Sequence, residues 1–301
     1  MTLREEESLQ ALHLLLEEFE GIFDLNDTSP AHLPPIHVDM KEEYKSKRFY
    51  RPEPLRSDKE QAIIDNNAKK LINQGKAKIN PMSEHQLAQV IVNRKDKEGH
   101  ILVGRERVCL DCRPINKGFQ HYKHPIPSSN KMLRTMSKSH YYSELDLTES
   151  FEQFRISEEL SNYLTFMTSF GKVSMQVLTY GVEFATDKVQ ETMTHEFFEF
   201  LETWLLIYVD NMLVHTLTRR AHLEALRTLF ERCKRINIHI RKEKCSFLQQ
   251  SIKTKRFVVE HNVIKPDPVK NDMLTKARVP TSVQYSLVYK NTFYKNNARP
   301  L

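Results

Sequence analysis

The sequence lacks the features of a membrane or secreted protein. It contains no run of eighteen apolar residues, and its amino-terminal stretch carries charges where a signal peptide needs an apolar core. We therefore expect a soluble, intracellular protein with no membrane partner, located in either the nucleus or the cytoplasm. A chain of 301 residues is long enough to bury a core and to form two or three subdomains.

Cysteine is also scarce, with four residues in the chain. Cys109 and Cys112 have the two-residue gap of a zinc knuckle. However, eleven residues separate Cys233 from Cys245, and no suitably spaced histidines follow. This spacing favours small apolar side chains that pack on strands and helices over a zinc site.

The charge balance is mildly basic. Lysine and arginine number 45 against 39 aspartate and glutamate residues, which gives a net charge of +6 and a pI near 9.0. Such an excess is compatible with a polyanionic partner, but an ordinary solvated basic face accounts for it equally well.

The most informative stretch runs from Trp204 to His215 and is apolar on both sides of an acid–amide pair. This pattern predicts two short buried strands joined by a tight turn at Asp210 and Asn211. The strands would hold the Asp210 carboxylate rigidly and present it outward. One carboxylate binds a catalytic divalent metal poorly, so a second acid is expected beside another strand.

Asp146 provides that second acid, between Leu145 and Leu147 in a segment that also has strand character. Two hard oxygen ligands on adjacent strands suit Mg²⁺ when the phosphates of a nucleotide supply the remaining ligands. Either segment alone is also compatible with two unrelated acids that happen to follow strands. The order and spacing of several motifs decide between these interpretations.

Three segments, LDLTESFEQFRI, LTYGVEFATDKVQ and IYVDNMLVHT, carry a family resemblance. They resemble, in the same order and with nearly the same spacing, the polymerase core of the reverse transcriptase in gypsy-type LTR retrotransposon Pol polyproteins. The corresponding family patterns are LDLxSGYHQIRI, MPFGLxNAPATFQ and VYxDDILVYS. The resemblance covers roughly residues 50–270. It implies an RNA-directed DNA polymerase that uses a primer on an RNA or DNA template together with dNTPs; other Pol-derived chains are compatible partners.

The resemblance also implies the site residues. Asp146, Asp210 and Asn211 occupy the catalytic positions. Two Mg²⁺ (or Mn²⁺) ions would be held by Asp146, Asp210 and the backbone carbonyl of Leu147. The implied nucleotide-binding positions are Lys95, Lys97, Arg107, Phe151, Tyr180, Gly181 and Gln190. For the lysines a solvated hairpin tip remains the alternative, and for Phe151 an ordinary core position.

Several positions depart from the family pattern. Asn211 replaces the second aspartate of the hairpin, which removes one negative charge beside the metal ions. Ser150 replaces a glycine, Thr186 replaces a proline, and the pair at 255–256 is Lys-Arg where the family has Leu-Gly. These departures indicate a degenerate copy whose activity is weak or lost. The alternatives are a catalytically dead fold that still binds nucleic acid and a relic that folds poorly.

The expected fold is α+β: a right-hand polymerase with fingers and palm, a split βαβ palm sheet backed by helices, and a largely missing thumb. The expected regions are an amino-terminal amphipathic helix with a proline-rich linker (1–56), fingers (57–140), a palm with the metal site (141–250) containing a fingers insertion at about 152–186, and a grip strand with a truncated thumb start (251–301). Local patterns predict helices over 3–24, 187–203 and 219–237, a capping box formed by Ser57 with Glu60, strands over 87–92 and 101–110, and a strand pair over 166–177 that turns at Gly171. Asp111 and Arg113 are expected to form a structural ion pair.

Overall fold

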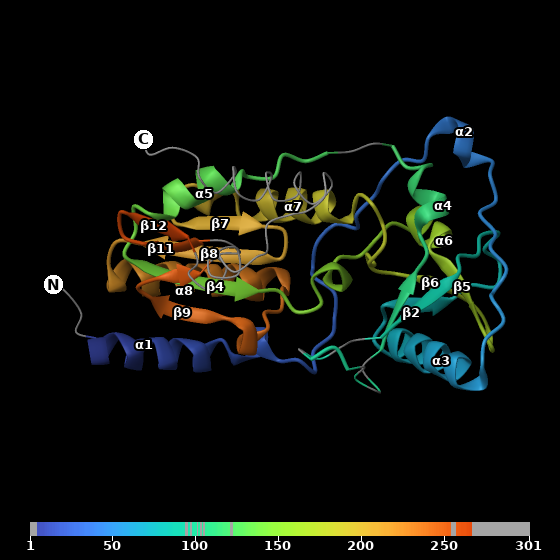
Figure 1. The fold of residues 1–301 in the computed structure, drawn as a ribbon, viewed down its shortest axis with the longest axis horizontal. Helices are drawn as coiled ribbons and strands as arrows, with labels where there is room; N and C mark the ends of the chain where they lie inside the picture. The colour runs from blue at the N-terminus through green and yellow to red at the C-terminus, as the bar shows by residue number, and fades with distance from the viewer. Residues whose placement is uncertain are drawn as a thin grey trace, which may run out of the picture.

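The computed structural model describes residues 5–93, 96, 98–100, 102, 104, 106–120, 123–253 and 257–266. These residues form an α+β molecule with two halves that lie side by side (Figure 1). We call the half built on the four-stranded sheet the palm half, and the half built on the two smaller sheets around β2 and β5 the fingers half. No helix in the described ranges is long and apolar enough to cross a lipid bilayer.

The palm half is organised around an antiparallel sheet with the strand order β7-β8-β4-β9. Its strands are β4 (Tyr141–Asp146), β7 (Leu205–Tyr208), β8 (Asn211–Thr216) and β9 (Ser246–Gln249). The helix α8 (Arg219–Ile236) packs against β8 and β4, and α7 (Ala185–Glu196) packs against β7. This is the helix-backed sheet that the sequence predicts.

The sequence of α8 explains both its limits and its orientation. The hydroxyl of Thr218 accepts a backbone hydrogen bond from the first turn, and Asn237 ends the helix in the left-handed conformation. Leu226, Phe230 and Cys233 recur at helical spacing, and all three are fully buried. The predicted helix over 219–237 is therefore confirmed.

A smaller apolar cluster covers one part of the palm sheet. It is formed by α5 (Ser129–Met136) together with the small antiparallel sheet β10 (Ile252–Lys253), β11 (Phe257–Glu260) and β12 (Val263–Pro266). Tyr142 of β4 lies within this cluster, and its hydroxyl donates to the carbonyl oxygens of Met136 and Ser139 at 2.9 and 2.6 Å. Of the region expected to hold the grip strand and thumb start (251–301), the structure describes 251–253 and 257–266, so the Lys-Arg departure at 255–256 lies outside the described residues.

The fingers half contains a three-stranded sheet, a two-stranded hairpin and several helices. The sheet consists of β1 (Ala77–Ile79), β6 (Gly171–Met175) and β5 (Thr165–Thr168). The hairpin consists of β2 (Gln89–Val92) and β3 (Arg107–Leu110). The helices are α2 (Glu42–Lys45), α3 (Asp58–Asn73), α4 (Arg113–Asn116) and α6 (Glu158–Tyr163). Across the whole described chain, the short 3-10 helices are η1 (Glu20–Phe23), η2 (Ser150–Gln153), η3 (Phe198–Phe200) and η4 (Lys242–Lys244). The strands predicted over 87–92 and 101–110 are present but shorter. The strand pair predicted over 166–177 is confirmed, but its turn is Ser169–Phe170, and Gly171 opens β6.

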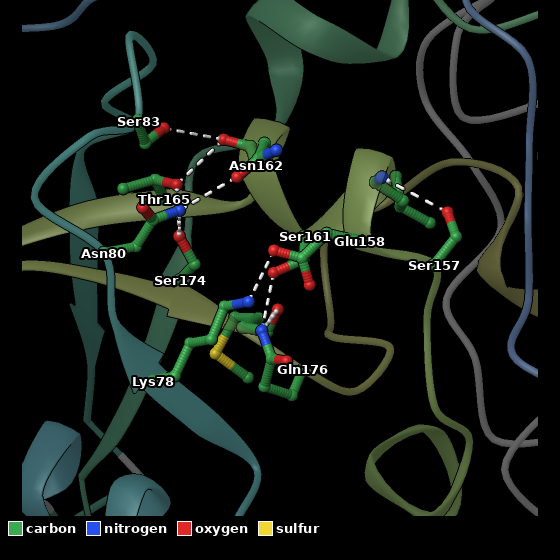
Figure 2. Close-up of polar contacts among 12 residues, drawn as sticks. Lys78, Asn80, Ser83, Ser157, Glu158, Ser161, Asn162, Thr165, Ser174 and Gln176 are labelled. Carbon is green, nitrogen blue, oxygen red and sulfur yellow. Dashed lines mark hydrogen bonds and ion pairs between the residues drawn. The ribbon is translucent and has the colours of Figure 1, made fainter.

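Buried polar side chains connect the fingers elements to one another (Figure 2). Asn80, just after β1, donates to Asn162 at 2.9 Å and to Ser174 at 3.0 Å. Thr165 lies 2.6 Å from the same Ser174 hydroxyl, and the Ser83 hydroxyl donates to the Asn162 carbonyl at 3.0 Å. Because these groups are satisfied within the protein, they fix the loop after β1 against α6 and the sheet.

Two helix predictions are confirmed in part. The capping box at the start of α3 is present, because Ser57 and Glu60 exchange hydrogen bonds with each other's backbone. The predicted helix over 3–24 is α1 (Glu5–Glu18) followed by η1, and it packs on α8. Leu9, expected on its apolar face, is 53% exposed.

Two other predictions are wrong in extent. The helix expected over 187–203 ends at Glu196, since the chain then turns through η3. The stretch 25–56 is extended but is not a free linker. It forms isolated β-bridges, among them Ile36 with Ile156 and Tyr50 with Gln86, and the His32 N–H donates to the Ile236 carbonyl of α8. Apolar side chains such as Ile36 anchor this stretch in the core. Its prolines therefore restrict the backbone conformation of a segment that is packed against the protein.

Candidate active site

The hairpin between β7 and β8 presents Asp210 at the end of the palm sheet. Tyr208 pairs with Asn211, so the two turn residues are Val209 and Asp210. The sequence-based placement of the turn at Asp210–Asn211 is therefore one residue too late, and Asn211 opens β8. Val209 has a φ of 58°, a conformation that β-branched residues rarely adopt. The turn carries local strain beside the candidate catalytic acid.

Gln190 of α7 fixes this turn from behind. Its side-chain oxygen accepts a hydrogen bond from the backbone N–H of Val209 at 2.7 Å, and its amide nitrogen donates to the Ile207 carbonyl at 3.3 Å. Gln190 is 1% exposed. The family resemblance implies that Gln190 contacts the nucleotide and template, whereas the structure directs its side chain to the hairpin backbone.

The second acid lies directly beside the hairpin. Asp146 is the last residue of β4 and pairs in register with Asn211 of β8. The backbone N–H of Leu147 donates to the Asp210 carbonyl at 3.0 Å. The structure therefore brings Asp146, Leu147, Asp210 and Asn211 together at one end of two adjacent strands.

Lys244 is a site residue that the sequence analysis missed. Its ammonium group donates to Oδ1 of Asp146 at 2.9 Å. The same aspartate accepts a hydrogen bond at its backbone carbonyl from the N–H of Arg241, at 2.9 Å. Lys244 lies in a charged run after α8, and no sequence signal distinguishes it from its neighbours.

A third carboxylate lies one position back on the same face of β4. Glu144 is half-buried, and burial raises its pKa above the usual range, with a further contribution from the negative charge of Asp146. Since side chains alternate along a strand, Glu144 and Asp146 share a face. Acidic groups are thus concentrated near Asp146, and Lys244 offsets part of their charge.

Three predicted nucleotide-binding residues also meet. The rings of Phe151 and Tyr180 pack edge to face with centroids 5.0 Å apart, and the Arg107 guanidinium lies 5.9 Å from the Tyr180 ring centroid. Burial raises the pKa of Tyr180, as do the negative charges of Glu152 and Asp210, while Arg107 lowers it. Lys95 and Lys97, the other predicted contacts, lie outside the described residues.

Gly181 has a structural reason to be glycine. Its φ is +100°, and a Cβ at this position would lie 2.8 Å from the carbonyl oxygen of Leu110. The Gly181 carbonyl accepts a hydrogen bond from Asn116 at 2.9 Å, which ties the segment after Tyr180 to α4. Nearby, the predicted ion pair of Asp111 with Arg113 is confirmed at 2.7 Å.

The structure also contains other potential metal ligands. Within the described part of the chain, the one group of three acidic or histidine side chains close enough to share a metal is Asp96, Glu98 and His100, all exposed. Cys112 and Cys233 are buried, and burial raises the pKa of each thiol to about 12. These two cysteines occupy the apolar packing positions that their spacing favours.

The fold and the paired acids define a class of protein. The chain has the fold of a right-hand polymerase with fingers and palm, as its likeness to solved structures shows. It superposes on the foamy viral protease–reverse transcriptase in complex with dsDNA with a TM-score of 0.80, at 17% identity, covering 97% of this chain and 59% of that one. The same viral protein in complex with an RNA/DNA hybrid gives a TM-score of 0.76 at 16% identity, over 96% of this chain and 38% of that one.

The family model for reverse transcriptase (RNA-dependent DNA polymerase) matches residues 94–258, which is more than half of the chain. The chain therefore belongs to the reverse transcriptase family. This match includes Asp146, Asp210 and every other candidate site residue discussed above.

The curated relatives are retrotransposon polyproteins. The chain is 23% identical over 218 residues to the retrovirus-related Pol polyprotein from transposon 297 of Drosophila melanogaster, which covers 72% of this chain and 20% of that protein. It is 28% identical over 174 residues to the Pol polyprotein from transposon 412 of the same organism, covering 58% of this chain and 14% of that protein. It is 25% identical over 243 residues to the transposon Tf2-7 polyprotein of Schizosaccharomyces pombe, covering 79% and 18%. The chain thus spans a fifth or less of the length of these relatives.

Proposed function

We propose that this chain is the fingers and palm of a gypsy-type LTR retrotransposon polymerase, and that its site performs template-directed nucleotidyl transfer in weakened form. The observation that supports this most directly is the pairing of Asp146 with Asn211, next to the Leu147–Asp210 hydrogen bond. The region boundaries expected from the sequence, with fingers at 57–140 and a palm at 141–250, belong to the same proposal.

The residues at this site suit divalent metal ions in kind. Asp146, Asp210 and the Leu147 carbonyl offer hard oxygen ligands of the type that Mg²⁺ and Mn²⁺ prefer. Bound there, two such ions would activate the primer hydroxyl and carry the triphosphate. The Lys244 ammonium contacts Oδ1 of Asp146 at 2.9 Å, so a metal ion that binds this oxygen must displace the lysine.

The chain's own contribution is to position the reactants. The edge-to-face pair of Phe151 and Tyr180 forms a firm apolar wall within reach of Asp210, and it suits the sugar of a nucleotide. Arg107, exposed over Tyr180, can contact the triphosphate from the fingers side. Gln190 holds the hairpin turn so that Asp210 keeps its place as charge develops.

Asn211 accounts for the weakening. Its amide matches the shape of an aspartate and keeps its hydrogen-bonding capacity but carries no negative charge. Asp146 and Asp210 must therefore bind two divalent cations with one acidic side chain fewer than the family pattern provides. In addition, the Lys244 ammonium already contacts Asp146. Metal occupancy and the rate of catalysis should both fall.

Primer extension on an RNA template with Mg²⁺ or Mn²⁺ tests this proposal. We expect faint or no incorporation by the unmodified chain and a clear gain in Asn211→Asp. Asp146→Asn in the Asn211→Asp background should abolish the gain. Full activity in the unmodified chain would contradict the weakening, and inactivity of the Asn211→Asp variant would contradict an otherwise intact site.

A second candidate function is nucleic-acid binding without catalysis, with the metal-ligand set too weakly charged to act. The ion pair of Lys244 with Asp146 favours it, because an internal cation already neutralises one of the two acids. This candidate predicts affinity for primer–template that falls with salt in the absence of divalent metal. Affinity that depends on added Mg²⁺ would instead support the polymerase proposal.

A further inference from the structure

A cavity of about 290 Å³ lies between the amino-terminal segment, the end of α3 and the two loops that follow β4 and α8. None of the predicted catalytic or nucleotide-binding side chains lines it. Its lining comprises Leu25, Asn26, Asp27, Thr28, Ser29, Lys70, Gln74, Lys76, Thr148, Glu149, Gln153, His239 and Arg241. Segments far apart in the sequence thus converge on one polar cavity.

The palm side of the cavity is fixed by Gln153. Its amide nitrogen donates to the carbonyl oxygens of Thr148 and His239 at 2.6 and 2.9 Å, and its side-chain oxygen accepts from the His239 N–H at 2.7 Å. Gln153 is 5% exposed. Gln153 therefore satisfies backbone hydrogen-bonding groups of Thr148 and His239 and holds the two residues in a rigid wall of the cavity.

The side chains of Thr148 and His239 make no hydrogen bonds in the structure. In the part of the chain that the structure describes, eight buried side-chain atoms lack a hydrogen bond, and four of them belong to cavity residues: Oε1 of Gln74, Oγ1 of Thr148 and both ring nitrogens of His239. His239 is 5% exposed, and its nearest carboxylate oxygen, on Asp27, is 3.6 Å from Nε2. Buried polar groups are normally satisfied, so this concentration indicates an occupant.

Two of the three cations that line the cavity make no ion pair among the described residues. Lys76 is paired with Glu149 at 2.6 Å and with Glu152 at 2.9 Å, so its charge is already met. Among the described residues, Lys70 and Arg241 have no carboxylate within salt-bridge distance. The remaining acid, Asp27, accepts from the Ser29 backbone and hydroxyl. Lys70 and Arg241 are therefore the two cations available to an anionic group in the cavity.

We propose that this cavity binds a small phosphate monoester with a hydroxylated body, of the size of ribose 5-phosphate. The phosphate lies against Lys70 and Arg241, and the hydroxyls reach Gln74, Thr148 and His239, which offer both donors and acceptors. At about 30 Å³ per water molecule, the cavity holds roughly ten waters, which suits a ligand larger than a bare phosphate ion. The inference does not depend on polymerase activity.

The site would also be coupled to the end of β4. The Thr148 N–H donates to the His239 carbonyl at 3.0 Å, and the Arg241 N–H donates to the Asp146 carbonyl at 2.9 Å. Both loops that line the cavity are thus bonded directly to each other and to the strand that carries Asp146. A ligand bound in the cavity would therefore act on the Asp146 end of β4 through these backbone hydrogen bonds.

The test uses the full chain without metal, primer or template. Ribose 5-phosphate is titrated at low salt by calorimetry and by NMR of labelled histidine rings. We expect saturable binding that shifts the His239 signals, and ribose without the phosphate should bind about tenfold more weakly or worse. Arg241→Gln should weaken binding about tenfold, while Arg241→Lys retains part of it.

Lys253→Gln provides the matched control, because it removes an exposed cation from β10, far from the cavity lining. Its affinity should equal that of the unmodified chain. Circular dichroism confirms that each variant folds. Absence of saturable His239 shifts at millimolar ribose 5-phosphate would show that the cavity holds ordered water alone. An equal loss in Lys253→Gln would show nonspecific attraction to a basic surface. Either result overturns the proposal, and neither bears on primer extension.

Discussion

The ammonium group of Lys244 lies 2.9 Å from Oδ1 of Asp146, in the position of a cation bound to the candidate catalytic aspartate. The pair is half exposed on the lysine side, so its worth is modest, on the order of 0.5 kcal/mol to 1 kcal/mol. A divalent ion must displace this contact, and the lysine therefore competes with the metal.

Lys244→Met should consequently bind Mn²⁺ about threefold to fivefold more tightly than the unmodified chain, since roughly 1 kcal/mol of competition is removed. Electron paramagnetic resonance of free Mn²⁺ measures this without nucleic acid. Lys242→Met is the control, because Lys242 lies over the Phe23 ring at 5.7 Å and makes no contact with Asp146. Equal affinities in all three proteins would mean that Lys244 leaves Asp146 at no cost.

Gln190→Leu should destabilise the protein by about 1–3 kcal/mol, because it leaves the Val209 N–H and the Ile207 carbonyl unsatisfied behind the hairpin. Urea denaturation followed by circular dichroism measures the loss. Gln74→Leu is a suitable comparison, since the side-chain oxygen of Gln74 accepts no hydrogen bond in the structure. A loss as large in Gln74→Leu would argue against the proposed support of the turn.

Gly181→Ala should cost about 1–3 kcal/mol, for two reasons that act together. A Cβ there meets the Leu110 carbonyl oxygen at 2.8 Å, and a φ of +100° strains any residue with a side chain. Gly21→Ala should be nearly neutral, since a Cβ there meets nothing within 4 Å and its φ is not positive. The difference between the two denaturation midpoints is the measurement, and a neutral Gly181→Ala would refute the close approach.

His222 should make the protein sensitive to acid. Burial lowers its pKa to about 3 in the folded state, while Ser143 and Thr216 bind its two ring nitrogens at 2.7 and 2.9 Å. The unfolded chain titrates near pH 6.5, so between these values the unfolded state binds the extra proton. Stability is therefore full above about pH 6.5 and falls as the pH drops toward 3.

His222→Gln removes this titration. Over pH 6 to 4.5, the slope of unfolding free energy against pH should become shallower by close to one proton. His215, whose pKa burial lowers to about 4, continues to contribute in both proteins. An unaltered slope in His222→Gln would show that this histidine does not control the acid response.

The sequence predicted the parts of the site that depend on local pattern. Apolar residues around Asp146 and Asp210 specify strands, and the burial of those strands brings the two acids to one end of the sheet. The position of the turn was missed by one residue, because Val209 adopts a positive φ that propensity argues against. The ordered motifs supplied the family and the fold.

The contacts of Gln190 and Lys244 could not be predicted in the same way. Both residues reach the site from elements distant in sequence, and their roles follow from packing that no local periodicity reveals. Likewise, Leu9 continues the apolar pattern of α1 but is exposed, which local periodicity does not reveal. The cavity beside His239 needs four segments to converge, which only the folded chain shows.

The segment between α1 and α3 crosses from one half of the molecule to the other. The Ala31 N–H donates to Gln153 at 2.7 Å and the His32 N–H to Ile236 at 2.8 Å, while Tyr50 bridges to Gln86. Because this segment is bonded to both halves, it limits how far they can rotate apart. Separating the two halves would therefore require these backbone hydrogen bonds to break.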